Sequence, residues 1–132
     1  MKKIITLLVL TFVVSAIYSQ TTLSFCTYVD QQGYCAFNNN KFITTPDSTW
    51  GRIFMRVQST ESLGTKLTYK LFTVSATGET MLTALDQTIM PDWLMAWQPY
   101  NFATNTKYSV QIFNDQNKMI CDKKFELVAG SR

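Results

Sequence analysis

The sequence predicts an all-β fold, a single antiparallel β-sandwich that follows an N-terminal signal peptide. Apolar and polar residues alternate with a period of two in several segments, which is typical of strands with one buried side. Turn-forming residues separate these segments at intervals of about eight to twelve residues, which predicts about seven or eight strands. At the C-terminal end, two alternating segments joined by a short polar turn predict a hairpin.

The predicted C-terminal hairpin has the clearest pattern in the chain. Residues 108–113 alternate so that Tyr108, Val110 and Ile112 share one face. The segment 114–117, Asn-Asp-Gln-Asn, consists of residues that tolerate tight-turn geometry. After this turn the chain alternates again, and the residues expected on its apolar face are Met119, Cys121, Phe125 and Leu127.

The first 19 residues have the layout of a secretory signal peptide. Lys2 and Lys3 precede a mostly apolar run over 4–17, and small and polar residues follow, with cleavage predicted after Ser19. A membrane anchor is the alternative, but the run is shorter than the roughly 20 apolar residues of a spanning helix and polar residues interrupt it. The segment resembles signal peptides of Bacteroidota. The predicted location is therefore outside the cytoplasm, in a periplasm or in the external medium.

The charge balance argues against nucleic acid or an anionic membrane as a partner. The full chain has 12 basic and 9 acidic residues, and two of the basic ones, Lys2 and Lys3, belong to the predicted signal peptide. The predicted mature part, residues 20–132, has the length of one β-sandwich domain and contains no linker or repeat. Its charges are nearly balanced and show no basic patch.

The three cysteines allow more than one pairing. Cys26 and Cys35 flank a predicted turn at 30–33, where Gly33 suits a positive φ. Because export permits disulfides, a Cys26–Cys35 bridge is predicted. Cys121 is then a buried free thiol. The alternative pairs Cys121 with Cys26 or Cys35 and ties the first strand to the last.

The middle of the chain reads as a loop followed by four strands. One segment is ambiguous: in 80–90, Met81, Leu82, Leu85 and Ile89 lie at helical spacing, yet the threonines and the turn before them favour a strand. The loop is predicted over 38–49, and strands are predicted over 50–58, 65–75, 80–90 and 93–102.

The segment 102–110 resembles the turn and strand before the last hairpin of fibronectin type III and related immunoglobulin-like domains. In those families a large apolar residue precedes a tyrosine by six positions, as Phe102 precedes Tyr108. The resemblance implies an Ig-like sandwich in which the ring of Tyr108 packs in the core and its hydroxyl bonds backbone at the corner. It covers about the last third of the chain. The whole chain also resembles small, signal-bearing sandwich proteins of Bacteroidota with unassigned roles.

The sequence lacks most of the residue types and spacings that catalytic sites use. The chain has no histidine, which removes the commonest general base and the commonest metal ligand. The cysteines lack the close pairs of zinc sites, and the acids lie mostly in predicted turns. The sequence therefore predicts a protein that is not an enzyme and that has no cofactor and no metal site.

The densest aromatic segment runs from Trp93 to Tyr100. On a strand, Trp93 and Trp97 share one face, and both faces are apolar. A central strand covered on both sides explains this, as does packing against a second copy. The functional interpretation is an exported binding module that recognises a glycan or a protein surface through Trp93, Trp97 and Tyr100. The alternative is a structural or accessory subunit of a cell-envelope or extracellular assembly.

Overall fold

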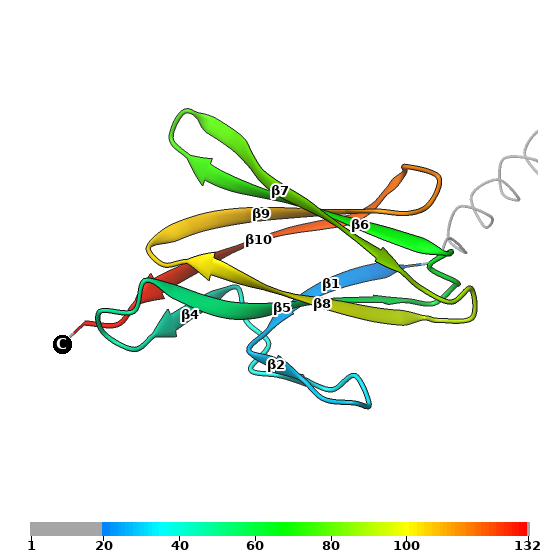
Figure 1. Ribbon diagram of the computed structural model, residues 1–132, viewed down its shortest axis with the longest axis horizontal. Coiled ribbons are helices and arrows are strands. Elements are labelled where there is room, and N and C mark those ends of the chain that lie inside the picture. The colour runs from blue at the N-terminus through cyan, green and yellow to red at the C-terminus, as the bar shows by residue number, and fades with distance from the viewer. Residues whose placement is uncertain (1–19, 132) are drawn as a thin grey trace, which may run out of the picture.

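The computed structural model describes residues 20–131, and this part of the chain is all-β, without a helix (Figure 1). The predicted signal peptide, 1–19, lies outside the described residues. Within residues 20–131, no helix is long and apolar enough to span a membrane. The strands are β1 (Thr21–Cys26), β2 (Tyr28–Val29), β3 (Cys35–Ala36), β4 (Lys41–Thr44), β5 (Trp50–Ser59), β6 (Lys66–Ser75), β7 (Gly78–Thr88), β8 (Met95–Ala103), β9 (Thr106–Phe113) and β10 (Met119–Ala129).

The strands form three sheets, and none of them is closed. One sheet has the order β1-β5-β8, the second has the order β4-β10-β9-β6-β7, and β2 and β3 form a small hairpin. Three expectations are wrong here. The described residues form ten strands, not about seven or eight, because the short strands β2 and β3 flank the predicted turn at 30–33 and the short strand β4 lies in the predicted loop. The segment 38–49 is not all loop, because β4 lies within it, and the pairing is not all antiparallel, because β4 runs parallel to β10. The ring of Phe42, which is 7% exposed, explains the last two differences, since it packs on Phe125 and holds this short segment at the sheet edge.

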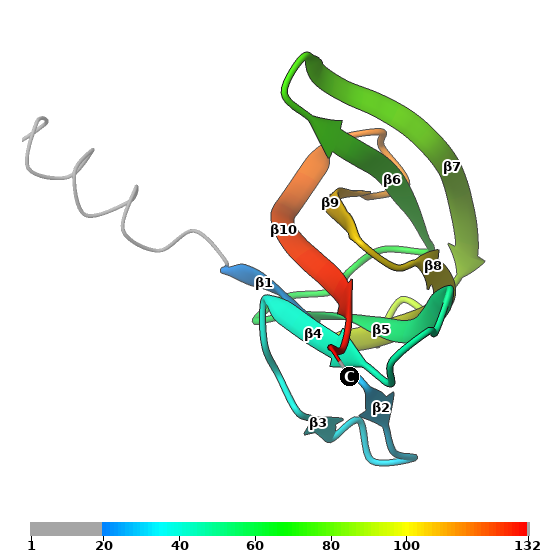
Figure 2. The same ribbon diagram turned by 90° about the vertical axis from the view of Figure 1, so that its left-hand side faces the viewer.

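The two larger sheets face each other across one hydrophobic core, which is compatible with a β-sandwich (Figure 2). Alternation places every second residue of each strand on the core side. The three-stranded sheet contributes Ile53, Met55 and Val57 from β5, all at most 2% exposed. The five-stranded sheet curls so that the end of β7 lies beside β8 (Figure 2). The face of each sheet away from this core is called its outer face below.

The predicted C-terminal hairpin is confirmed, except at Met119: expected on the apolar face, it is 47% exposed, because the register shifts between Met119 and Cys121. β9 and β10 pair antiparallel, and the backbone N–H of Asn114 donates to the Lys118 carbonyl at 2.9 Å to close the turn. Asn117 has a φ of 59°, a left-handed conformation that asparagine tolerates. The strand interpretation of residues 80–90 is also confirmed over most of its length by β7.

The corner at Tyr108 has the geometry that the resemblance implied. The Tyr108 hydroxyl donates to the Ala103 carbonyl at 2.6 Å, across the turn that joins β8 to β9. Its ring, 1% exposed, lies 4.8 Å from the ring of Phe102, centroid to centroid. The tyrosine therefore contributes to the core with its ring and to the turn with its hydroxyl.

β8 is an edge strand, so the interpretation of the aromatic segment as a central strand is wrong. Among the strands of residues 20–131, β8 pairs only with β5, and it begins at Met95 rather than at Trp93. A side chain of the five-stranded sheet donates a hydrogen bond to one backbone carbonyl of β8: the Gln87 amide of β7 donates to the Trp97 carbonyl at 3.0 Å. The hydroxyl of Tyr69 donates to the same Gln87 side chain at 2.7 Å. This chain of hydrogen bonds links the two sheets.

Candidate functional site

The small hairpin of β2 and β3 contains a tight turn in which a side chain of the turn accepts hydrogen bonds from the turn's own backbone. One oxygen of the Asp30 carboxylate accepts the backbone N–H groups of Gln32 and Tyr34, each at 2.9 Å. Gly33 closes the turn with a φ of 84°, where a side chain would be strained. Local chemistry therefore shapes the tip of the hairpin.

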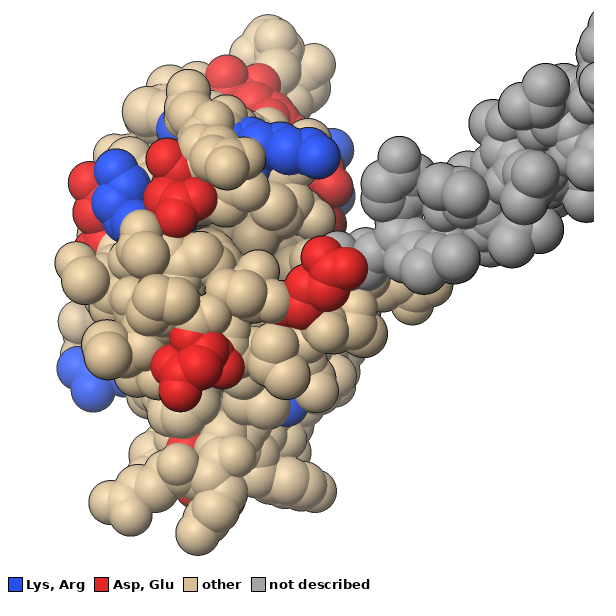
Figure 3. Space-filling view, turned by 90° about the vertical axis from the view of Figure 1, so that its right-hand side faces the viewer, with Lys and Arg blue, Asp and Glu red and all other residues tan. Residues whose placement is uncertain are grey.

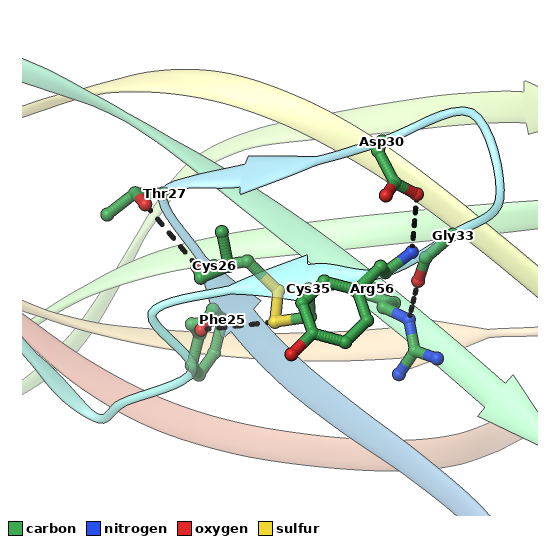
Figure 4. Close-up of a disulfide and its surroundings, with 9 residues drawn as sticks. Phe25, Cys26, Thr27, Asp30, Gly33, Cys35 and Arg56 are labelled. Carbon is green, nitrogen blue, oxygen red and sulfur yellow. Dashed lines mark hydrogen bonds between the residues drawn. A yellow bond between two sulfur atoms is a disulfide. The ribbon is translucent and has the colours of Figure 1, made fainter.

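A disulfide joins this hairpin to the three-stranded sheet, as predicted (Figure 4). Cys26 ends β1 and is fully buried, and Cys35 begins β3; their Cα atoms lie 5.5 Å apart. The structure shows Cys121 as a free thiol, so the alternative pairings are not those observed. Burial, with a smaller contribution from Asp122, raises the pKa of the Cys121 thiol to about 12, which makes it a weak nucleophile.

The hairpin lies across the outer face of the three-stranded sheet. The Arg56 Nε donates to the Gly33 carbonyl at 2.7 Å (Figure 4). The backbone of Gly33 is so close to β8 that a Cβ atom there would overlap the Met95 sulfur and lie 3.2 Å from the Trp97 ring. The Tyr28 ring meets Phe54 edge-on at 5.8 Å. Covalent, polar and aromatic contacts therefore all fix the hairpin on the sheet.

Large aromatic side chains remain exposed around this contact. Tyr28, Tyr34 and Phe37 of the hairpin segment are 58%, 72% and 80% exposed. The lower part of the molecule, where the hairpin projects, is mostly tan in Figure 3, with a few acidic and basic side chains among the uncharged ones. We call this surface the hairpin face, and its members are Tyr28, Tyr34, Phe37, Trp50, Arg52, Phe54, Arg56, Trp97, Pro99 and Asn101.

The structure does not bring the three predicted binding residues together on one surface. Trp97 is half-buried beside the hairpin, where the tip covers part of it. Trp93 precedes β8 in a turn, where its backbone N–H donates to the Met90 carbonyl. Tyr100 packs against the core, with its ring 4.9 Å from Phe102. Of the three, Trp97 is the member of the hairpin face.

A hollow of about 400 Å³ lies away from the hairpin face, where the β5–β6 and β9–β10 loops meet. It contains Glu61 and Asp115, but the Asp115 carboxylate already accepts the backbone N–H and the hydroxyl of Thr65 at 3.0 and 2.9 Å. These bonds lower the pKa of Asp115 and join the two loops. In the part of the chain that the structure describes, no group of three or more potential metal ligands occurs. We therefore interpret this hollow as the place where two loops are held together by hydrogen bonds.

Most residues of the hairpin face are not among the binding residues predicted from the sequence. The signal was present: Tyr28, Tyr34 and Phe37 cluster around the predicted disulfide turn, in a segment too short to bury them. The alternation of β5 also placed Arg52 and Arg56 on one side, opposite the core residues. What the sequence did not reveal is that the hairpin lies over β5 and β8, because that contact joins residues far apart in the chain.

No model of a known protein family matches this chain, and a search of curated proteins found no relative.

Proposed function

We propose that the protein is an exported, non-catalytic binding module with an Ig-like sandwich fold, and that the hairpin face recognises a glycan or protein surface. The fold assignment is supported by the two facing sheets and by the Tyr108 corner with its bond to Ala103. The export assignment is supported by the signal-like residues 1–19 and by the Cys26–Cys35 bridge.

The observation that carries the binding assignment is a set of exposed rings on a rigid support. Exposed aromatic clusters are unusual on a surface whose only need is solubility, and they are typical of recognition sites. The disulfide and the Arg56–Gly33 bond hold the support in place. Such preorganisation lowers the entropic cost of binding.

The test is intrinsic tryptophan fluorescence of the mature, oxidised protein titrated with a panel of soluble polysaccharides and oligosaccharides. Tyr34→Ala and Trp50→Ala should each weaken a detected interaction several-fold without changing the unfolding transition, because both side chains are largely exposed. Met81→Ala is the matched control, since Met81 is 52% exposed but lies on β7 in the other sheet. Equal loss in all three variants would contradict a site at the hairpin face.

A second candidate function is a structural or accessory subunit, and β7 favours it. In the described part of the chain, this strand of 11 residues pairs only with β6, and its stretch 80–85, Thr-Met-Leu-Thr-Ala-Leu, has no charge and no proline. Long uncharged edges are templates for strand addition. Leu82→Lys should then abolish any oligomer seen by light scattering. If the protein is a monomer at all concentrations and the variant changes nothing, self-association through the β7 edge is contradicted.

A further inference from the structure

The two larger sheets differ in how their charges are arranged. Strands β1, β5 and β8 contain no aspartate and no glutamate, and their only charged residues are Arg52 and Arg56. The five-stranded sheet carries charges of both signs, and some of them form ion pairs. Its ion pairs are Lys41–Glu126, Lys107–Glu126 and Lys124–Glu79, with nitrogen–oxygen distances of 3.6–3.9 Å.

Both arginines point away from the core, and each is held by a neutral acceptor. The core residues Ile53 and Met55 alternate with them on β5, so Arg52 and Arg56 share the outer face. The Arg52 Nε donates to the Asn101 side-chain oxygen at 3.2 Å, as Arg56 does to the hairpin backbone. Among residues 20–131, neither guanidinium forms an ion pair. Their terminal NH₂ groups therefore keep their capacity for a carboxylate.

Arg52 is the more accessible of the two. It is exposed, whereas Arg56 is half-buried beside the hairpin. Arg52 also lines an open hollow of about 410 Å³ together with Pro99, Tyr100 and Asn101. Trp50, 54% exposed, lies two residues before Arg52 on the same face, about 7 Å along the strand. A ring and a guanidinium thus stand side by side on an open surface.

We propose that the hairpin face binds an acidic polysaccharide, with the carboxylates of its sugar units held by Arg52 and, secondarily, by Arg56. This inference rests on the proposed function and specifies its ligand. A guanidinium matches a carboxylate through two parallel hydrogen bonds. The exposed rings offer flat apolar area to sugar faces. The three strands carry no acid that would repel an anionic chain, and the one acid of the hairpin, Asp30, already accepts two backbone N–H groups of its own turn.

A glycan fits this face better than an acidic peptide. Extended peptides commonly bind by adding a strand to a sheet edge. At the edge next to this face, Gln87 already occupies the Trp97 carbonyl. On the outer face, side chains rather than backbone groups are available. Such a surface suits a chain that is recognised through its ring faces and its charges.

The experiment compares two forms of one polymer. The mature, oxidised protein is titrated by calorimetry with polygalacturonate and with the same polymer methyl-esterified, which removes the charge and keeps the backbone. The acid form should bind, its affinity should fall as salt is raised, and the ester should bind at least tenfold more weakly. Arg52→Ala should lower affinity for the acid form about tenfold or more, and Arg52→Lys should retain part of it. Lys118→Ala is the matched control, since it removes an equal, exposed charge from the β9–β10 turn.

Three results would overturn the inference. Equal, salt-independent binding of acid and ester would show a neutral glycan site and would leave the proposed function intact. Tighter binding of polyglutamate than of polygalacturonate would assign the face to an acidic protein. Failure to bind any acidic polysaccharide in a set that also includes alginate would remove the ligand class. The neutral-glycan titrations with Tyr34→Ala and Trp50→Ala would then still decide the proposed function.

Discussion

Replacing both Cys26 and Cys35 by alanine is predicted to lower the free energy of unfolding by roughly 3.5 kcal/mol. The bridge closes a loop with a sequence separation of nine, and the loss of chain entropy in the unfolded state for that length corresponds to about 2.6 kcal/mol. Cys26 is fully buried, so alanine also removes packed sulfur, at about 1 kcal/mol. Reduction of the unmodified protein keeps the sulfur in place and should cost only the first amount.

Urea unfolding followed by tryptophan fluorescence separates the two contributions. The reduced protein should lose about 2.6 kcal/mol and melt roughly 10 °C lower. The double variant should lose about 1 kcal/mol more than the reduced protein. Cys121→Ala is the control, because it changes a half-buried thiol that closes no loop. Its effect should stay within about 1 kcal/mol.

One result would refute this reasoning. If the double variant unfolds at the same urea concentration as the parent, while a neutral quencher gains access to Trp97, then the hairpin opens independently of the sheets. The loop entropy would then not contribute to global stability, and the contacts of Gly33 with Met95 and Trp97 would be too weak to couple the hairpin to the core.

Three further changes have expected outcomes. Tyr108→Phe removes the bond to the Ala103 carbonyl and should cost about 1 kcal/mol or more in urea unfolding; no loss would contradict the corner's role. Gln87→Met leaves the buried Tyr69 hydroxyl without its acceptor and should cost about 1–3 kcal/mol, part of which Tyr69→Phe restores in the double variant. At pH 8 the thiolate fraction of Cys121 should be on the order of a thousandfold below that of an ordinary cysteine, because burial raises its pKa from 9.0 to about 12. Alkylation measured by mass should therefore be slow in the folded protein, faster as pH approaches 12, and fast in urea; equal rates folded and unfolded would contradict the burial.

The parts of the fold that the sequence predicted correctly depend on neighbours in the chain. Alternation along β9 and β10 and the asparagines between them specify a hairpin locally, and the spacing from Phe102 to Tyr108 specifies the corner. The Cys26–Cys35 pairing follows from a turn that contains its own glycine and aspartate. In each case the residues that decide the structure lie within about twenty positions of one another.

The errors concern contacts between distant segments. Nothing around Lys41–Thr44 shows that this stretch runs parallel to β10, because its partners lie more than 80 residues away. The aromatic run before Tyr100 is apolar on both faces whether its strand is central or at an edge. An edge strand is distinguished from a central one here by contacts with distant residues: the hairpin packs over Trp97, and the Gln87 side chain bonds to the Trp97 carbonyl. For the same reason the sequence indicated aromatic residues at a site but did not indicate which of them share a surface.

The contrast between the two outer faces argues for a function of the arginines. On the five-stranded sheet, Lys124 and Glu79 pair, and the Lys70 ammonium lies 4.1 Å from the Phe113 ring centroid, so cations meet neighbouring partners. That arrangement is sufficient for a soluble surface. On the hairpin face, Arg52 and Arg56 are oriented by neutral acceptors and have no acid on their own three strands. A surface that needed only solubility would gain from an acid beside each of them. Their three strands carry no such acid, and the one acid of the hairpin, Asp30, accepts two backbone N–H groups of its own turn. This is the arrangement expected where the opposite charge comes from a ligand.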